Sequence, residues 1–507
     1  MQDIIRRILT ARVYDVAVET PLDPLPRLSG RLGRQVLLKR EDLQPVFSFK
    51  IRGAYNRVSA LPDEALARGV LCASAGNHAQ GVALAAARKG ARAVIVMPVT
   101  TPAIKVAAVK ALGAEVVLHG DTFDAAHDQA RRIEAETGAV FIHPFDDLDV
   151  IAGQGTVGLE ILRRHSDPIA AVFVPIGGGG LAAGMAAIIR FLRPEVRVIG
   201  VEPADAPTMK AALMANQVVT LDHVGLFADG VAVRRAGDHT FRLCRELLDD
   251  IVLVDTDAIC AAVKDVFEDT RAAPEPSGAL ALAGLKAWAA ANPSQADDGA
   301  LIAVNSGANL NFDRLRHVAE RAELGEGAEG LFAVTLPDRR EDYLRFLNLL
   351  DGRAVTAFNY RWSGDGAARI VVGVALRHGA AEREDVAAAV RAAGYGVEDM
   401  SDNETAKLHV RHMVGGRASG LPNERLFRFQ FPERPGAFLR FMSALQPMWN
   451  LTLFHYRHHG DDVGRVLAGV DAPPADHAAL TNALDALGYP YVDETDNPAA
   501  RLFLRGG

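Results

Sequence analysis

Short runs of apolar and β-branched residues alternate with alanine-rich stretches over roughly the first 320 residues. The runs are continuous rather than alternating, which is typical of strands buried on both faces of a parallel sheet. The pattern therefore predicts an α/β architecture with ligand sites at the carboxyl ends of its strands. The expected strands are 93–97, 115–118, 171–174, 196–201 and 251–254, and the expected helices include 77–89, 122–137 and 257–271.

The pattern changes at residues 321–330, an acidic, glycine-rich stretch that we interpret as a linker. Beyond it the chain repeats itself at an offset of 94 to 96 residues, as in the pairs Phe332 and Phe427, Tyr360 and Tyr456, and Gly394 and Gly488. A nearly constant offset indicates two copies of one small domain, at 331–403 and 426–497. Each copy reads strand, helix, strand, strand, helix, strand, which is the order of a ferredoxin-like α+β domain.

The composition of the 507-residue chain is that of an ordinary globular protein, with 49% apolar and 23% charged residues. Its net charge of -8 argues against a nucleic-acid partner, which would require a basic surface. The three cysteines lack disulfide or zinc-binding spacing, which favours a reducing compartment. From the cysteines we therefore expect a cytoplasmic protein without a metal site. We expect no membrane partner, because no run of about 18 apolar residues is present.

The motif Ser48-Phe49-Lys50 lies between a predicted strand (36–39) and a segment that favours a helix (51–60). A lysine at such a junction can point into a cleft, where loss of water makes its amine neutral and nucleophilic. Such an amine can form a Schiff base with an aldehyde cofactor. Most lysines are solvated surface charges, so this interpretation depends on the other motifs.

The stretch ASAGNHAQG (73–81) follows a predicted strand and opens a predicted helix. Ser74, Ala75, Gly76 and Asn77 would expose free backbone N–H groups there, which suits a substrate carboxylate. Asn77 could also hydrogen-bond a cofactor hydroxyl. The alternative is an ordinary helix cap formed by Ser74 or Asn77.

Four consecutive glycines and a leucine lie between the next strand and helix: Gly177, Gly178, Gly179, Gly180 and Leu181. A backbone without side chains can surround a phosphate with its N–H groups. The same stretch also fits a dinucleotide fingerprint through Ala182, with Glu202 a further 20 residues along as the ribose acceptor. A nicotinamide-dependent dehydrogenase is therefore a rival interpretation.

Ser306 follows the predicted strand 300–304 and could hydrogen-bond the nitrogen of an aromatic ring. The alternative is a structural turn. Lys50, the 74–77 loop, the four glycines and Ser306 all lie at strand ends, in an order that one ring cofactor with a phosphate can satisfy. A dehydrogenase has no use for Ser306 or for the lysine motif.

These motifs closely resemble the fold-type II, tryptophan synthase β-like, pyridoxal-phosphate enzymes, and specifically the biosynthetic threonine dehydratase (threonine ammonia-lyase) family. The resemblance extends over nearly the whole chain. It rests on KREDLQPVFSFKIRGAY (39–55), SAGNHAQGVA (74–83), PIGGGGLAAG (175–184), FADGVAV (227–233), EPSGALALAG (275–284), SGAN (306–309), FNYR (358–361), AKLHVRHMVGG (406–416), FPERPGAFLRF (431–441) and LFHYR (453–457).

The resemblance implies a catalytic domain at 1–320, with a small lobe at about 45–145. It implies that Lys50 is the Schiff-base lysine, that Asn77 contacts the cofactor's ring oxygen, and that Ser306 contacts the pyridine nitrogen. Residues 177–181 would hold the phosphate of pyridoxal 5'-phosphate. The implied reaction is the elimination and deamination of L-threonine, and possibly L-serine, to a 2-oxo acid and ammonia, as the first step of isoleucine biosynthesis.

The resemblance also implies that the two repeats are ACT-like regulatory domains of a homotetramer, with isoleucine as the inhibitor and valine as the opposing effector. Our candidate effector-site residues are the aromatic positions of the repeat and a glycine before a helix: Phe358, Tyr360, Gly436, Phe454 and Tyr456. A non-catalytic amino-acid sensor is a third interpretation, which the intact lysine motif disfavours.

The sequence departs from its relatives at three points. Asn305 stands where an apolar or small residue is usual, which leaves the packing beside Ser306 open. Ala75 stands where serine racemases place a second catalytic serine, so we do not expect racemase activity. Glu202 matches the start of the racemases' divalent-metal site, but Thr208 replaces its last carboxylate.

Overall fold

The computed structural model describes residues 1–293, 299–432, 437–444, 449–457 and 463–504. It divides the chain into two compact units, Met1–Ala322 and Glu323–Gly507. No helix in these ranges is long and apolar enough to cross a membrane.

The boundary between the units falls inside the stretch that the sequence predicts as a linker, but the chain there is regular. Helix α14 (Asp313–Gly325) continues through the boundary, and strand β11 (Glu329–Pro337) begins soon after it. Val318 and Ala322 are buried one helical turn apart. This spacing forms an apolar stripe, which stabilises a helix despite the glycine at its end.

The first unit has a large lobe built on six strands: β1 (Leu22–Pro24), β2 (Val36–Arg40), β7 (Ile169–Pro175), β8 (Arg197–Pro203), β9 (Asp250–Val254) and β10 (Ala300–Asn305). Their order is β1-β2-β10-β7-β8-β9, and all neighbours are parallel except β1 and β2. Every residue of β2, β7 and β10 is buried. Burial on both faces explains why β7 reads as a continuous apolar run, whereas β2 also buries Lys39 and Arg40.

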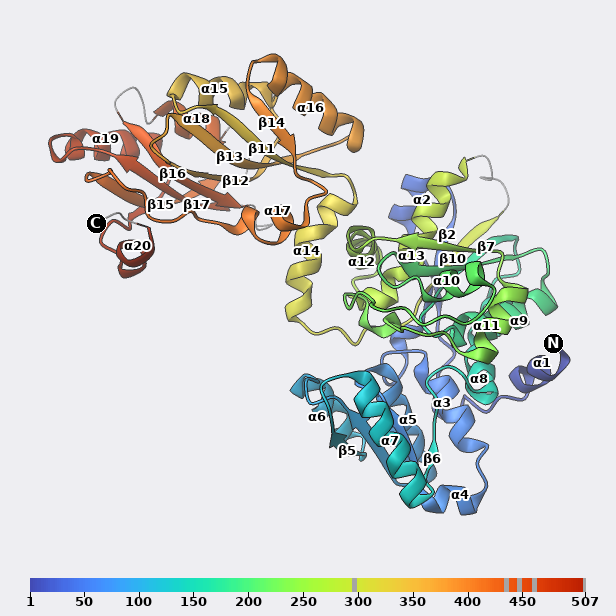
Figure 1. Cartoon of the computed structure of the whole chain (residues 1–507). Coiled ribbons are helices and arrows are strands. Elements are labelled where there is room, and N and C mark those ends of the chain that lie inside the picture. The colour runs from blue at the N-terminus through green and yellow to red at the C-terminus, as the bar shows by residue number, and fades with distance from the viewer. Residues whose placement is uncertain (294–298, 433–436, 445–448, 458–462, 505–507) are drawn as a thin grey trace. The chain divides into compact units, whose positions relative to one another are not determined.

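Helices cover both faces of the large sheet (Figure 1). One face packs against α1 (Gln2–Leu9), α8 (Leu148–Arg164), α9 (Gly180–Leu192), α10 (Thr208–Ala215) and α11 (Asp238–Leu247). The other packs against α2 (Pro26–Leu32), α12 (Thr256–Thr270), α13 (Pro276–Ala291) and the first part of α14. Two 3-10 turns, η1 (Glu41–Leu43) and η2 (Asp229–Val231), lie in the connecting loops.

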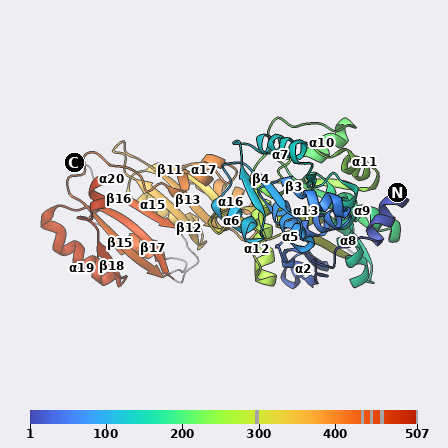
Figure 2. The same cartoon turned by 90° about the horizontal axis from the view of Figure 1, so that it is seen from below.

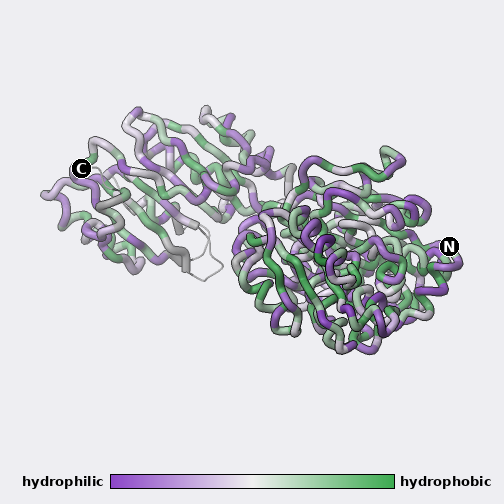
Figure 3. The backbone as a smooth tube through the Cα atoms, turned by 60° about the horizontal axis from the view of Figure 1, so that its bottom comes forward, coloured by the Kyte–Doolittle hydropathy of each residue, from purple (hydrophilic) through white to green (hydrophobic). Residues whose placement is uncertain are grey.

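The small lobe contains a parallel sheet of four strands: β3 (Val70–Ala73), β4 (Ala93–Met97), β5 (Glu115–Leu118) and β6 (Val140–Phe141). Its helices are α3 (Lys50–Ser59), α4 (Asp63–Arg68), α5 (Asn77–Lys89), α6 (Ala103–Ala111) and α7 (Phe123–Thr137). One core lies between the sheet and α3 and α5, and a second lies under α7. Figure 2 shows β3 and β4 beside α5 in this lobe, and Figure 3 shows hydrophobic stretches running through the interior of the unit.

The second unit contains both sequence repeats. The first is β11, α15 (Arg340–Leu349), β12 (Val355–Arg361), β13 (Ala367–Ala375), α16 (Ala380–Ala392) and β14 (Gly396–Asp399). The second is β15 (Glu424–Pro432), α18 (Ala437–Ala444), β16 (Asn450–Arg457), β17 (Val463–Asp471), α19 (His477–Leu487) and β18 (Tyr491–Asp493). Short helical segments complete the unit: α17 (Glu404–Leu408), η4 (Val410–His412), η5 (Pro474–Asp476) and α20 (Pro498–Phe503).

The two repeats share one antiparallel sheet in the order β14-β11-β13-β12-β16-β17-β15-β18. The central pair β12 and β16 joins them, so that Phe358 lies opposite Tyr456 and Tyr360 opposite Phe454. Figure 1 shows α15, α16, α18 and α19 along one face of this sheet. The element order of each repeat is the ferredoxin-like order that the sequence predicts.

The four aromatic residues proposed for the effector site lie in the core at this junction. Phe358 and Phe454 are at most 1% exposed, and their rings meet edge to face with centroids 5.6 Å apart. Tyr360 donates a hydrogen bond to Asp338 and lies edge to face with Tyr343 of α15. An effector that contacts these rings would have to displace packed side chains. Gly436 lies outside the described residues.

Candidate active site

The lysine motif lies against the loop that follows β10. The Phe49 N–H donates to the Ser306 carbonyl (3.2 Å), and the Ala308 N–H donates to the Phe47 carbonyl (2.9 Å). Lys50 comes next, as the first residue of α3. These backbone bonds bring two sequence motifs together although they are more than 250 residues apart.

The Lys50 side chain is half-buried, and its amine is turned to a backbone carbonyl. It donates a hydrogen bond to the Pro144 carbonyl (3.0 Å). Desolvation lowers the pKa of Lys50 to about 8, opposed by the nearby negative charge of Glu275. A useful fraction of the amine is therefore neutral and nucleophilic near neutral pH.

Asn77 begins α5, but it does not cap the helix. The cap position is Gly76, and no side chain accepts a hydrogen bond from the first turn. Asn77 Nδ2 instead donates to Glu275 Oε1 (2.6 Å), and Asn77 Oδ1 accepts from Asn309 Nδ2 (2.7 Å). A Cβ atom added to Gly76 would meet nothing within 4 Å. In the 74–77 loop the Ser74 N–H donates to the Val96 carbonyl (3.1 Å) and the Gly76 N–H to the Ser74 hydroxyl (3.3 Å). The Ala75 and Asn77 N–H groups and the open space above Gly76 suit an anion site.

The glycine turn at 177–180 connects β7 to α9 and is closely packed from behind. A Cβ atom on Gly178 would lie 2.3 Å from the Phe145 ring, and one on Gly177 would lie 2.9 Å from Val231 Cα. Gly179 has a φ of +97°, which favours glycine. No side chain caps the first turn of α9, so its N–H groups are left for an anion.

The segment between β6 and α8 ties this turn to Lys50. Its Pro144 carbonyl holds the Lys50 amine, and its Phe145 ring covers Gly178. Asp146 accepts hydrogen bonds from the first N–H groups of α11, whose Thr240 hydroxyl donates to the Gly178 carbonyl (2.6 Å). Sequence reasoning missed this segment, because its role depends on contacts with three distant elements.

Ser306 lies at the carboxyl end of β10 and is buried. Its hydroxyl donates to the Ser277 carbonyl (3.1 Å), because a carbonyl can only accept. The adjacent Asn305 is fully buried, and neither amide atom has a hydrogen-bond partner in the structure. A Cβ atom on Gly278 would lie 2.7 Å from Asn305 Oδ1. The glycine on α13 therefore leaves space for the Asn305 side chain.

Comparison with known proteins shows which family has this arrangement. A family model described as pyridoxal-phosphate dependent enzyme matches residues 13–307, and one described as the C-terminal regulatory domain of threonine dehydratase matches 320–410 and 415–504. The biosynthetic L-threonine dehydratase IlvA of Burkholderia multivorans is 55% identical over 505 residues, covering 99% of each chain. The chain belongs to the biosynthetic threonine dehydratase family.

Other threonine dehydratases support this assignment. The IlvA protein of Escherichia coli is 53% identical, over 99% of this chain and 97% of its own. The solved structure of the processed form of threonine deaminase isoform 2 from Solanum lycopersicum has a TM-score of 0.62 and 50% identity, over 64% of this chain and 88% of its own. The predicted fold class, a fold-type II catalytic part with C-terminal regulatory domains, is confirmed.

The residues of this chain fit pyridoxal phosphate, the cofactor of the family. A desolvated amine suits the aldehyde, and an uncapped helix start with a glycine turn suits the phosphate. Asn77 and Ser306 offer polar side chains of the kind that hold a ring oxygen and a ring nitrogen.

Glu202, at the end of β8, is hydrogen-bonded to the first turn of α10. Its carboxylate accepts hydrogen bonds from the Met209 and Lys210 N–H groups at the start of α10 (2.7 and 2.9 Å). Burial raises the pKa of Glu202 to about 7. With both oxygens engaged, Glu202 is not placed to receive the ribose of a nicotinamide cofactor. The Thr208 hydroxyl donates to the Val233 carbonyl.

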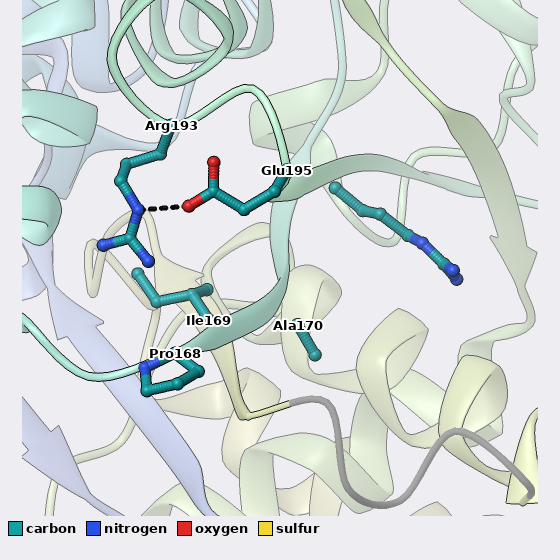
Figure 4. Close-up of a pocket in the computed structure, with 6 residues that line it drawn as sticks. Pro168, Ile169, Ala170, Arg193 and Glu195 are labelled. Atoms are coloured by element: carbon teal, nitrogen blue, oxygen red, sulfur yellow. Dashed lines mark hydrogen bonds and ion pairs between the residues drawn. The ribbon is translucent and has the colours of Figure 1, made fainter.

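A cavity of about 370 Å³ lies at the amino ends of β7 and β8, the edge of the large sheet opposite the glycine turn. It is lined by Pro168, Ile169, Ala170, Arg193, Glu195 and Arg197. Figure 4 shows the Arg193–Glu195 ion pair at its wall. Because the family motifs lie at the other strand ends, this cavity is separate from the candidate active site.

The packing behind the glycine turn leads to a prediction for Gly178→Ala. The new Cβ would overlap the Phe145 ring, so the ring or the turn must shift. Overpacking of this kind costs about 1–3 kcal/mol, and if that cost falls on the cofactor-bound state it corresponds to about a 5–150-fold loss of cofactor affinity. Titration of each apoenzyme with pyridoxal phosphate, followed by absorbance, measures the cofactor affinity of Gly178→Ala and of the parent.

The control is Gly30→Ala on α2, where a Cβ atom meets nothing within 4 Å. This variant should bind the cofactor as the parent does. Unchanged affinity in Gly178→Ala would show that the turn does not hold the phosphate.

Proposed function

We propose that this protein converts L-threonine to 2-oxobutanoate and ammonia by pyridoxal-phosphate-dependent elimination, as the first step of isoleucine synthesis, and that L-serine is a second substrate. The main support is that Lys50, Asn77 and Ser306 are joined by hydrogen bonds through the segments 47–49 and 275–277. The full chain also aligns with biosynthetic threonine dehydratases.

Each side chain has a distinct task in this proposal. The Ala75 and Asn77 N–H groups bind the substrate carboxylate, as a helix start favours an anion, while the Ser74 and Gly76 N–H groups donate to the Val96 carbonyl and the Ser74 hydroxyl. Lys50 Nζ takes the α-proton in its neutral form and returns a proton to the leaving hydroxyl. Bound pyridoxal phosphate supplies a ring that delocalises the negative charge left on the α-carbon. Asn77 and the turn at 177–181 orient that ring.

Ser306 sets the electronic character of the ring in this proposal. A neutral hydroxyl does not stabilise a positive charge as an aspartate would, so the ring nitrogen is left unprotonated. The Ser306 hydroxyl donates to the Ser277 carbonyl, and it must rotate away from that carbonyl to donate to a ring nitrogen. With Ser306 as its partner, a bound ring would be a weak electron sink, which would favour prompt loss of the β-hydroxyl over slower side reactions.

The proposal includes feedback control through the second unit, with isoleucine as the inhibitor and valine as its opponent. The family match of residues 320–410 and 415–504 to a regulatory domain supports a regulatory role for this part of the chain. The candidate effector residues Phe358, Tyr360, Phe454 and Tyr456 are packed where strands β12 and β16 join the repeats, so an effector that contacts them would have to displace these side chains. We also propose a homotetramer in the cytoplasm, which sedimentation velocity and cell fractionation would test.

The direct test measures 2-oxobutanoate and ammonia released from threonine, with isoleucine, with valine and with neither. We expect stoichiometric products, inhibition by isoleucine and relief by valine. Absence of both products from the cofactor-loaded protein would favour the non-catalytic sensor. Products without any isoleucine effect would contradict only the regulatory part.

Ser306→Asp tests the electronic role of the serine. A carboxylate there would favour a protonated ring nitrogen and so strengthen the electron sink. We expect threonine turnover to slow by about tenfold or more, which is the free-energy scale of a one-unit change in pKa. We also expect a long-wavelength absorption band to accumulate with threonine. Ser306→Ala is the matched control, since it removes the hydroxyl without adding charge. An unchanged spectrum and rate in Ser306→Asp would contradict the proposed contact.

A further inference from the structure

Glu275 is a buried carboxylate at the centre of the site to which no role has been assigned above. It is the residue before α13 and is 4% exposed. Its Oε1 atom accepts two hydrogen bonds, from Asn77 Nδ2 (2.6 Å) and from the Ser277 hydroxyl (3.0 Å). Glu275 therefore contacts both the first residue of α5 and the first turn of α13.

These bonds belong to a continuous chain of contacts. At one end Asn309 Nδ2 donates to Asn77 Oδ1 (2.7 Å). At the other, the Ser277 carbonyl accepts from the Ser306 hydroxyl (3.1 Å). The chain runs from Asn309 through Asn77, Glu275 and Ser277 to Ser306. It thus joins the two side chains that we assign to the ring oxygen and the ring nitrogen of the cofactor.

The Glu275 carboxylate is buried without an ion-pair partner among the described residues. Burial is the main cause that raises its pKa, and the negative charge of Asp229 adds to it. The hydrogen bonds from Asn77 and Ser277 and the positive charge of Lys105 act in the opposite direction. A buried carboxylate costs stability unless its hydrogen bonds compensate, and such residues concentrate at functional sites.

We propose that Glu275 is a positioning residue that holds Asn77, the proposed contact of the cofactor's ring oxygen, through the direct hydrogen bond from Asn77 Nδ2. The inference rests on the proposed role of Asn77. It explains the orientation of the Asn77 amide, because a carboxylate accepts from Nδ2 but would repel Oδ1. With Oδ1 engaged by Asn309, the second Nδ2 hydrogen is the group that remains for the ring oxygen.

The glycine after Ser306 fits this arrangement. A Cβ atom on Gly307 would lie 2.7 Å from Glu275 Oε1, so a larger residue there would push the carboxylate away. The Glu275 N–H also donates to the Gly307 carbonyl (3.1 Å). The backbone thus fixes Glu275 against the Ser306 loop, while its side chain reaches Asn77.

The experiment compares Glu275→Ala, Glu275→Gln, Asn77→Ala and the double variant Asn77→Ala/Glu275→Ala. Apoenzyme is titrated with pyridoxal phosphate, and the visible circular dichroism of the bound cofactor reports the orientation of its ring. We expect Glu275→Ala to weaken binding about tenfold or more, the scale of a lost hydrogen bond to a charged group. Its visible circular dichroism should also change.

Two comparisons separate positioning from a general structural effect. Glu275→Gln keeps an acceptor oxygen but loses the charge, so we expect about a threefold loss, smaller than that of Glu275→Ala. The double variant should bind no more weakly than Asn77→Ala, because Glu275 acts through Asn77. Glu246→Ala, an exposed glutamate of α11, is the control and should match the parent.

Wild-type affinity and dichroism in Glu275→Ala would overturn the inference, and so would losses that multiply in the double variant. If Glu275→Ala does not fold, Glu275→Gln decides: an unchanged affinity and dichroism overturns the inference, and a loss with altered dichroism supports it. If Asn77→Ala itself binds cofactor as the parent does, the proposed cofactor contact of Asn77 is what fails.

Discussion

Replacing Lys50 with alanine is expected to lower 2-oxobutanoate formation from threonine by at least about 10³-fold, because one side chain supplies both the covalent anchor and the base. The buried amine, with its pKa lowered to about 8, has no substitute at the start of α3. Cofactor affinity should fall in parallel, as measured by absorbance during titration of the apoenzyme.

Lys110→Ala, an exposed lysine at the end of the small-lobe helix α6, is the matched control and should keep parental turnover. Far-ultraviolet circular dichroism shows whether both variants are folded. Turnover of folded Lys50→Ala within tenfold of the parent would exclude Lys50 as the catalytic base and leave the family assignment intact.

A chain that ends at Gly325 is expected to remain active and to lose inhibition by isoleucine. The first unit has its own hydrophobic cores and is large enough to fold alone. Coupling between effector and active site is commonly worth about 1–3 kcal/mol, so the lost effect should be a change of about 5–150-fold. The inhibition is measured from the threonine kinetics of the full and shortened chains, with and without isoleucine.

The end point at Gly325 keeps α14 whole. Arg314 on this helix donates to the Phe227 carbonyl (3.0 Å) and pairs with Asp229, which also pairs with Lys105 of the small lobe. A cut within α14 would disturb these contacts near the candidate site. Full isoleucine inhibition of the shortened enzyme would place the effector site in the first unit and contradict our interpretation of the repeats.

Much of the architecture could be predicted from the sequence, because burial and periodicity are local properties. The predicted strand 93–97 and helix 77–89 have the bounds that the structure shows for β4 and α5. The short edge strand β1 was not predicted, because its three residues are partly exposed and form no apolar run. The repeat can be detected in the sequence because equivalent positions in the two copies are buried, as in the pairs Phe332 and Phe427 or Tyr360 and Tyr456, and so require similar residues.

The lysine, the glycine turn and Ser306 could be placed at strand ends from the sequence alone, since each motif interrupts a strand-to-helix pattern. Only the tertiary structure decided what surrounds them. Asn77 and Glu275 are 198 residues apart, and Glu202 caps α10 although it also fits a ribose-binding pattern. The aromatic residues of the repeats turned out to be core residues at a strand junction. Partners of this kind depend on which elements pack together, and local spacing carries no information on that packing.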